Sequence, residues 1–310
     1  MGIEVRVLSR ALVRSLLPPV LQQLDLVEDT YVAMASGDVE LPPKPGIHPR
    51  ADSFIHAMPA YLRSSDVAAM KWVSGYPSNP ARGLPYISGV IVVNDPETGL
   101  PRGIMDASEI TAARTAAATG VCVRRFAAQD WSRAAILGCG EQGRYHATVL
   151  SALNADGVIH AYDIDPGRAA GLPGHVTVAA TPRDAVRDAD IIVTAGPIVD
   201  DPSPAITDGW LPARCLLAPI DFDFYVTAEA IEAADVLLVD DVDQFEYYRA
   251  QGHFRDWRSA DMTVGEALRH TTRYDRVACV NLGVGSLDAA FAAAVLDAAA
   301  DADAGQVVEL

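Results

Sequence analysis

Basic residues are scarce in this sequence, and their scarcity excludes one class of partner. Lysine and arginine together number 24 against 41 aspartates and glutamates, which gives the 310-residue chain a formal charge of −17. Nucleic-acid binding depends on basic side chains that neutralise phosphates. We therefore expect no nucleic-acid partner, and we interpret the acidic residues as a solvated surface.

Long apolar runs and closely spaced cysteines are also missing. No uninterrupted apolar stretch is long enough to cross a bilayer, and the sequence starts with no cleavable signal. The four cysteines are far apart and lack metal-ligand spacing; they are Cys122, Cys139, Cys215 and Cys279. We expect a soluble, cytoplasmic protein with no membrane contact, with buried free thiols and with no metal site.

The chain is organised around a glycine-rich stretch. An apolar run over 134–137 leads into Gly138, Gly140 and Gly143, and a helix-forming segment follows. In a dinucleotide-binding fold the first glycine allows a sharp turn, the second lets a pyrophosphate approach the backbone, and the third lets the helix pack on the strand. The phosphates then bind at the helix N-terminus. This pattern predicts a Rossmann domain.

An acidic residue, Asp163, ends the next apolar run about twenty residues after the last glycine. Its carboxylate is expected to accept hydrogen bonds from both ribose hydroxyls of NAD and to repel the extra phosphate of NADP. We therefore predict NAD, although Arg144 and Arg168 could soften that preference; the alternative is a helix cap plus an ordinary acidic loop residue. The predicted cofactor-binding residues are Thr115, Gly138, Gly140, Glu141, Gln142, Gly143, Asp163, Ile164, Arg168, Thr194, Ala195 and Gly196.

Outside this stretch the hydrophobic pattern changes along the chain. Strand patterns over 53–57, 67–73 and 87–94 predict an antiparallel sheet, and an alanine-rich helix over 108–125 follows them. After Asp163, strands and helices alternate, as a doubly wound parallel sheet requires. A final helix is expected over 287–300, and the ten-residue tail after it is expected to be mobile.

Six motifs occur in an order that is specific to one family. They are Met58-Pro59-Ala60-Tyr61, Lys71-Trp72-Val73, Tyr76-Pro77-x-Asn79, Asp95-Pro96-x-Thr98-Gly99, Ile110-Thr111-x-x-Arg114-Thr115-Ala116-Ala117 and Leu137-Gly138-x-Gly140-x-Gln142-Gly143. On these motifs the chain resembles the ornithine cyclodeaminase and μ-crystallin family over most of its length. The resemblance implies an α/β homodimer. A substrate-binding and dimerisation domain of α+β type would span 1–118 and 292–310, and an NAD-binding Rossmann domain with a doubly wound parallel sheet would span 119–291.

The resemblance also implies an activity. Enzymes of this family are NAD-dependent oxidoreductases or deaminases that move a hydride at the α-carbon of a small amino or imino acid. In the cyclodeaminase the hydride returns to the same carbon, whereas a one-way amino-acid dehydrogenase or ketimine reductase passes it in one direction only. The third alternative is a non-catalytic, μ-crystallin-like protein that binds a nicotinamide cofactor and a small ligand.

Catalysis on an α-amino acid requires that its carboxylate be clamped, which a planar guanidinium does with paired hydrogen bonds. Arg114, Lys71 and Arg50 are the candidates, and the resemblance assigns all three to substrate binding. Arg114 stands on an Ala- and Thr-rich helix, where an unpaired charge would be costly to bury. The alternatives are a structural ion pair for Arg114 and a surface lysine for Lys71.

A catalytic acid is expected just after the fifth Rossmann strand. Lys71 is the other residue expected to be catalytic. The family has a glycine-containing loop with one aspartate there, whereas this chain offers Asp221 or Asp223, of which we prefer Asp221 slightly. His56 lies near the position of an acidic substrate contact in the cyclodeaminase, which argues against ornithine; it is a substrate contact or a core histidine. Asp288 matches a further family aspartate, and we interpret it as a helix cap.

Overall fold

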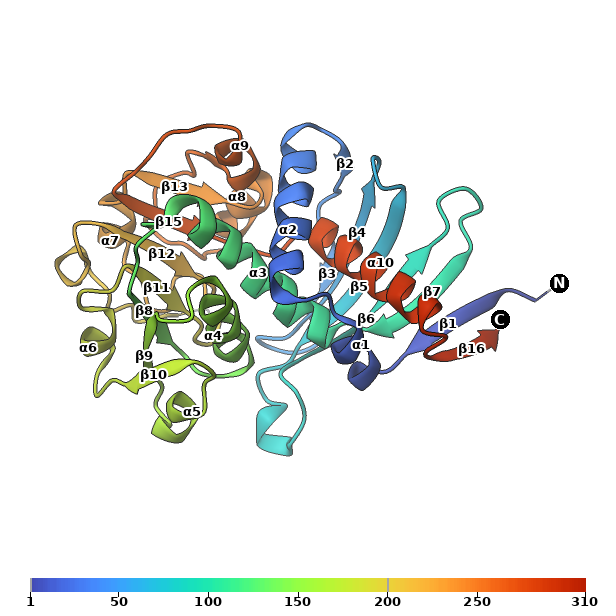
Figure 1. The fold of residues 1–310 in the computed structure, drawn as a ribbon, viewed down its shortest axis with the longest axis horizontal. Coiled ribbons are helices and arrows are strands. Elements are labelled where there is room, and N and C mark those ends of the chain that lie inside the picture. The colour runs from blue at the N-terminus through green and yellow to red at the C-terminus, as the bar shows by residue number, and fades with distance from the viewer. Residues whose placement is uncertain (1, 200) are drawn as a thin grey trace. The chain divides into compact units, whose positions relative to one another are not determined.

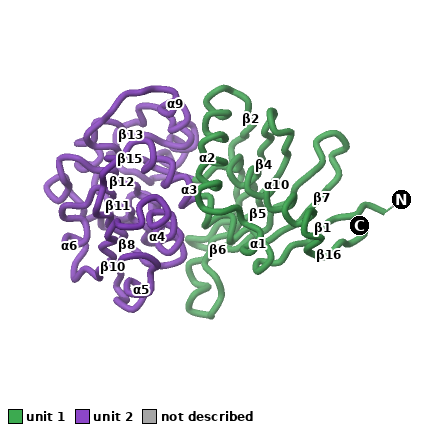
Figure 2. The backbone as a smooth tube through the Cα atoms, in the orientation of Figure 1, with its two compact units in different colours: residues 1–114, 283–310 green, residues 115–282 purple. Residues whose placement is uncertain are grey.

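The computed structural model describes residues 2–199 and 201–310, and it divides the chain into two compact units (Figure 2). Unit 1 comprises residues 1–114 and 283–310, and unit 2 comprises residues 115–282. Both boundaries lie earlier than the expected ones at 118/119 and 291/292. The second has a physical cause: helix α10 (Gly285–Asp301) belongs to unit 1 from its first residue, because Gly285 lies against the backbone of Met58.

Unit 1 contains a mixed eight-stranded sheet in the order β16-β1-β7-β6-β5-β4-β2, with β3 also paired to β4 (Figure 1). Strands β4, β5, β6 and β7 pair in antiparallel fashion, as the strand patterns predict, whereas β1 pairs with β7 in parallel. The strands are β1 (Glu4–Leu8), β2 (Val39–Glu40), β3 (Gly46–Ile47), β4 (Phe54–Leu62), β5 (Val67–Gly75), β6 (Ile87–Asn94), β7 (Pro101–Asp106) and β16 (Gln306–Glu309). The helices of this part of the chain are α1 (Arg10–Leu16), α2 (Val20–Ala35), the short 3-10 turn η1 (Pro80–Arg82), α10 and the first turns of α3 (Ser108–Phe126).

One face of this sheet is buried and the other is partly exposed. Side chains alternate along a strand, so Lys71 and Val73 on β5 share the face that α10 packs against, and both are buried. The intervening Trp72 is 42% exposed, and Val90, its partner on β6, is 41% exposed. The buried face holds the core of unit 1.

The tail is not the mobile segment that its composition predicts. Residues 306–309 form β16, which pairs antiparallel with β1 at the edge of the sheet. The prediction was wrong because the backbone hydrogen bonds of the tail are supplied by the opposite end of the chain, and no local pattern reports such a partner.

Unit 2 is built on a parallel eight-stranded sheet in the order β10-β9-β8-β11-β12-β15-β13-β14 (Figure 1). Its strands are β8 (Arg133–Leu137), β9 (Val158–Tyr162), β10 (His175–Val178), β11 (Ile191–Thr194), β12 (Cys215–Pro219), β13 (Val236–Val239), β14 (Met262–Thr263) and β15 (Arg276–Val280). Its helices are α4 (Glu141–Leu153), α5 (Pro166–Ala170), α6 (Pro182–Val186), η2 (Asp208–Trp210), α7 (Ala228–Glu232), α8 (Val242–Ala250), α9 (Val264–Leu268) and the rest of α3. The predicted doubly wound sheet is confirmed, and the strand order reverses between β8 and β11, where such folds bind their ligands.

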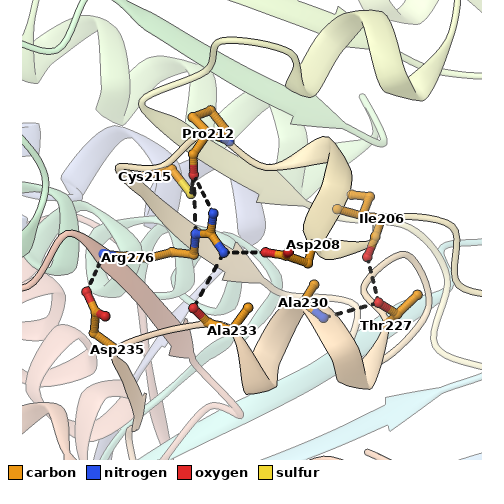
Figure 3. A network of polar contacts seen from close by, with 9 residues as sticks. All are labelled: Ile206, Asp208, Pro212, Cys215, Thr227, Ala230, Ala233, Asp235 and Arg276. Carbon is orange, nitrogen blue, oxygen red and sulfur yellow. Dashed lines mark hydrogen bonds and ion pairs between the residues drawn. The ribbon is translucent and has the colours of Figure 1, made fainter.

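A polar network stabilises the loop between β11 and β12 (Figure 3). The Arg276 guanidinium at the start of β15 donates to a carboxylate oxygen of Asp208 and to the carbonyl oxygen of Pro212. The Asp235 carboxylate accepts from the backbone N–H of the same arginine at 2.9 Å. One arginine, whose side chain is 16% exposed, therefore fixes the part of this loop that leads into the start of β12.

Among the residues described, no helix is sufficiently long and apolar to cross a membrane.

Candidate active site

The glycine turn after β8 has the geometry that a bound dinucleotide needs. Gly138 has a φ of +91°, and an added Cβ would lie 2.3 Å from the carbonyl oxygen of Ala195. An added Cβ on Gly143 would lie 2.3 Å from the carbonyl oxygen of Gly138, so the helix packs directly on the turn. At Gly140, by contrast, a Cβ would meet nothing within 4 Å. The turn is thus closely packed at Gly138 and Gly143, whereas the space beside Gly140 is open and leaves room for a pyrophosphate.

Asp163 lies beside this turn, as its spacing predicts. Its Oδ2 atom accepts from the backbone N–H of Cys139 at 2.8 Å, and its Oδ1 atom accepts from the N–H of Asp165 at 2.9 Å. The carboxylate is therefore held at the end of β9 next to the glycines. Ile164, which is 89% exposed, and Arg168, whose Nε lies 3.6 Å from Asp165, follow on the same surface loop and on α5.

A buried polar network behind the turn escaped prediction. His146 on α4 contacts the carbonyl oxygen of Gln142 at 2.8 Å and the hydroxyl of Thr119 at 3.0 Å, and the Asn281 amide donates to the same hydroxyl. Burial lowers the pKa of His146 to about 4, so the ring is neutral. The Oε1 atom of Gln142 is buried and lacks a hydrogen-bond partner among the described residues. The one sequence signal was the four-residue spacing from Gln142 to His146 on one helix face.

These features fit a dinucleotide. The open space over Gly140, the anchored Asp163 carboxylate and the unsatisfied Gln142 amide oxygen lie on the segments where an NAD site was predicted. Thr115 is also buried, on α3, whereas Glu141 at the start of α4 is exposed. A ligand with ribose hydroxyls, phosphates and an amide matches this set of donors and acceptors.

Asp221, one of the two candidate acids, is 1% exposed and reaches from the end of β12 to the end of β11. Its Oδ1 atom accepts from the Thr194 hydroxyl at 2.5 Å, and its Oδ2 atom accepts from the backbone N–H of Gly196 at 2.7 Å. Burial raises the pKa of Asp221 to about 7 although both hydrogen bonds oppose the shift. A carboxyl group with this pKa can hold or release a proton near neutrality.

The other candidate, Asp223, points to a different neighbour because of the residue between them. Phe222 adopts a φ of +61°, the left-handed conformation that a glycine adopts without strain. Its buried ring packs against Tyr248 and Phe254 at centroid distances of 5.0 and 4.8 Å, which offsets the backbone strain. Asp223 then accepts from the backbone N–H of Arg255 at 3.4 Å. The two acids therefore have separate surroundings.

In unit 1, the structure brings together two of the three predicted clamp residues around one carboxylate. Lys71 Nζ lies 2.6 Å from Asp288 Oδ2, and Arg114 Nε lies 3.1 Å from Asp288 Oδ1. The Lys71, Arg114 and Asp288 side chains are 1%, 7% and 1% exposed. Asp288 is not the helix cap we expected: the cap position of α10 is Val284, and Asp288 is the fourth residue of the helix. We call these three residues the charge cluster.

Burial and pairing oppose each other within the charge cluster. Burial lowers the pKa of Lys71 to about 8, and the Asp288 carboxylate limits the shift. For Asp288, burial would raise the pKa, but the Lys71 ammonium and the Arg114 guanidinium outweigh it and hold the pKa below its usual value. With all three groups ionised, the cluster has an excess of one positive charge.

Glycine is required beside Arg114. Gly283 has a φ of +84°, and a Cβ at this position would lie 2.6 Å from both terminal nitrogens of the guanidinium. The loop that enters α10 therefore closes over the arginine by its backbone alone. The left-handed backbone and the close approach to the guanidinium both account for a glycine at position 283.

The remaining predicted residues of unit 1 lie before and on β4. Arg50 is exposed, and its guanidinium donates to the carbonyl oxygen of Pro49 at 2.6 Å. His56 is half-buried rather than part of the core; its ring stacks on Phe54 at 4.5 Å and meets His48 edge-on at 6.2 Å. Burial and the nearby Lys44, His48 and Lys71 lower the pKa of His56 to about 4.

Comparison with known proteins gives a consistent result. A family model described as the ornithine cyclodeaminase/mu-crystallin family matches residues 4–244. The nodulation efficiency protein NfeD of Rhizobium meliloti is 36% identical over 317 residues, which covers 98% of each chain. The structure of Thermococcus litoralis Δ1-pyrroline-2-carboxylate reductase in complex with NADH and L-proline has a TM-score of 0.87 and 24% identity, with coverage of 98% of this chain and 100% of that one. An archaeal alanine dehydrogenase dimer with bound NAD has a TM-score of 0.84 and 25% identity, with 99% of each chain covered.

These matches define a class of two-unit proteins with a Rossmann sheet. The chain belongs to the ornithine cyclodeaminase/μ-crystallin family. The resemblance drawn from the six motifs and the fold class are thus confirmed.

The charge cluster makes a prediction about stability. Replacing Asp288→Asn removes the carboxylate that is paired with both buried cations, so we expect the free energy of unfolding to fall by about 3 kcal/mol. Urea unfolding measures this change. Asp297→Asn, an exposed acid on the same helix, is the matched control and should change stability by less than about 0.5 kcal/mol. Equal transition midpoints for the two variants would contradict the cluster.

Asp221 makes a prediction about pH. Its folded pKa of about 7 lies above the unfolded value near 3.8, so the stability it contributes is complete at low pH and is lost as pH rises towards 7. Asp221→Asn lacks this titration. The difference in unfolding free energy between variant and wild type should therefore shift in favour of the variant by about 2 kcal/mol between about pH 5.5 and about pH 8. A difference that does not change with pH would show that Asp221 stays ionised throughout.

Proposed function

We propose that this protein is an NAD-dependent oxidoreductase that acts at the α-carbon of a small amino or imino acid. The observation that carries the proposal is the charge cluster, a buried group of two cations and one anion with one positive charge in excess. Such a group fits a single carboxylate that arrives from solvent. Relatives of the family support the class, since one is a reductase with NADH and L-proline and another is an alanine dehydrogenase with NAD.

Arg114 and Lys71 would bind the substrate carboxylate. Asp288 holds Arg114 by Nε and Lys71 by Nζ, so it fixes both side chains in place before a substrate binds. Preorganised donors lose little entropy when the ligand arrives and orient the α-carbon for reaction. Arg50, exposed before β4, would add a third contact from a more mobile side chain.

Asp221 is our choice for the residue that exchanges a proton with the substrate nitrogen. Its pKa of about 7 lets it accept a proton when an amine is oxidised and return it when an imine is reduced. It also lies against Thr194 and Gly196, two of the predicted cofactor residues. Asp223, bound to a backbone N–H near α8, would not take this role.

Unit 2 would hold the cofactor. When bound, NAD accepts a hydride from the α-carbon or returns one to it. The glycine turn would leave space for the pyrophosphate, and the Asp163 carboxylate would accept from the ribose and disfavour the 2′-phosphate of NADP. Thr194, Ala195 and Gly196 at the end of β11 would line the site further along.

Turnover tests this proposal. Small amino acids with NAD, and cyclic imines with NADH, should change the absorbance of NADH, and NADPH should serve less well. Product without net NADH would instead identify a cyclodeaminase, which returns the hydride.

Arg114→Lys keeps a charge but loses the planar fork, so kcat/KM should fall about 100-fold. Arg63→Lys, an exposed pair with Glu40, is the control. Unchanged kcat/KM in Arg114→Lys would refute the clamp, and ligand binding without turnover would identify a μ-crystallin-like binding protein.

We also propose that the exposed face of the unit 1 sheet forms a homodimer interface. Trp72 and Val90 are directly opposite on β5 and β6, and Met70 and Val92 continue the same apolar face. A sheet face of this kind needs another layer to cover it. The alanine dehydrogenase relative is a dimer.

A cytoplasmic location fits the four free, buried cysteines, which a reducing compartment keeps unpaired.

Solution mass tests the dimer. Trp72→Asp introduces a charge into the proposed interface, and the measured mass in light scattering should fall from that of a dimer to that of a monomer. Leu100→Asp is a matched control, because Leu100 is 43% exposed against 42% for Trp72, but lies in the turn between β6 and β7. A wild-type monomer, or a dimer that survives Trp72→Asp, would overturn the interface.

A further inference from the structure

Two aromatic side chains, Phe224 and Tyr225, belong to the turn that carries the candidate acids after β12. The backbone N–H of Phe224 donates to the carbonyl oxygen of Asp221 at 3.2 Å, which closes a four-residue turn with the left-handed Phe222 inside it. The first and last residues of the turn therefore lie close together.

Gly196 at the end of β11 is where the Phe224 ring and the Asp221 carboxylate meet. A Cβ added to this glycine would lie 2.6 Å from Cδ1 of the ring and 3.0 Å from Oδ2 of Asp221. The same Oδ2 atom accepts from the backbone N–H of Gly196 at 2.7 Å. The ring edge and the carboxylate both pack against this glycine, and a larger residue at position 196 would push one of them away.

Tyr225 supports the Phe224 ring. The two rings pack edge to face, with centroids 4.9 Å apart and an interplanar angle of 88°. The carbonyl oxygen of Tyr225 accepts from the N–H groups of Ala205 and Ile206 at 3.0 and 2.8 Å, and the next residue, Val226, forms a β-bridge with Ile206. The ring is thus held by an ordered segment.

Exposure changes across this contact. Asp221 is 1% exposed, whereas Phe224 is half-buried. The Phe224 ring therefore lies between the carboxyl group and solvent. An apolar ring in such a place excludes water from a carboxyl group and disfavours its ionised form.

Burial is the largest cause of the raised pKa of Asp221, and the surrounding polar groups contribute less. The Asp223 carboxylate raises this pKa slightly further, whereas the Thr194 hydroxyl and the Gly196 N–H lower it. Tyr225 also interacts electrostatically with Asp221, but burial raises the pKa of its phenol to about 12, so the phenol is neutral. The protonation state of Asp221 thus depends mainly on how well its neighbours exclude water.

From these contacts we infer that Phe224 is a positioning residue for proton exchange at Asp221: its ring covers the carboxyl group, excludes water from it and fixes it against Gly196. The inference rests on the proposed function and adds one residue to it. Without the ring, water would solvate the carboxylate, so Asp221 would lose its proton at a lower pH.

Carbon-13 NMR of protein labelled at the aspartate carboxyl carbons tests the inference without turnover. The resonance that is absent from Asp221→Asn belongs to Asp221. Its titration midpoint should lie at about pH 7 in the wild type and about one pH unit lower in Phe224→Ala. Phe224→Leu keeps an apolar cover and should shift the midpoint by less than half as much.

Tyr247→Ala is the control for loss of an aromatic ring, because Tyr247 is 51% exposed and lies on α8. It should leave the Asp221 midpoint where it is. An unchanged midpoint in Phe224→Ala, or a shift of the same size in Phe224→Leu, would overturn the inference.

The pH dependence of turnover gives a second readout. Asp221 must be ionised to accept a proton when an amine is oxidised, so kcat/KM should rise with pH through its midpoint, and in Phe224→Ala this rise should move to lower pH by the same amount. Loss of activity at every pH with no movement of the profile would show a merely structural role and would overturn the inference. A shifted NMR midpoint in a protein without NAD-linked turnover would sink the proposed function alone. NAD-linked turnover with an unmoved midpoint would sink the inference alone.

Discussion

A carboxylate shared by two buried cations is the constraint on which unit 1 depends. Any one of these three charges buried alone would cost several kcal/mol, so Asp288, Lys71 and Arg114 have to meet. They come from α10, β5 and α3, which are remote in the sequence. Unit 1 is therefore complete only when the last helix returns to the N-terminal sheet. This requirement explains why the unit is made from both ends of the chain, and it leaves the cluster with the positive charge on which the proposed function rests.

Local patterns were sufficient to predict the glycine turn and the parallel sheet of unit 2. The determinants of a Rossmann turn lie within about thirty residues, so strand, glycines, helix and Asp163 could be identified together, and the structure places them together. The capping box of Thr263 and Glu266 shows the same logic at the scale of one helix turn. Lys71 and Arg114 could be identified as well, because a charged residue in an apolar pattern is costly unless it has a partner.

Contacts between distant segments could not be predicted. Asp288 looked like a helix cap because its partner Arg114 is 174 residues away, and the ion pair that was only an alternative for Arg114 is present. The tail looked mobile because its partner β1 is at the other end of the chain. The choice between Asp221 and Asp223 depended on the left-handed backbone of Phe222, which no residue preference signals. In the first two cases the deciding atoms belong to a distant part of the chain, and in the third the backbone conformation of one residue decides.

Asp221 and Asp288 show that residue type and burial together do not determine what a carboxyl group can do. Asp221 and Asp288 are both 1% exposed, yet the pKa of Asp221 is raised to about 7 and that of Asp288 is lowered. The difference lies in their neighbours. Asp221 meets a hydroxyl and a backbone N–H, which are neutral and only partly offset burial, so it suits proton exchange. Asp288 meets an ammonium and a guanidinium, so it stays ionised and suits the holding of charge. A carboxylate between cations positions other groups, and a carboxylate among neutral donors carries a proton.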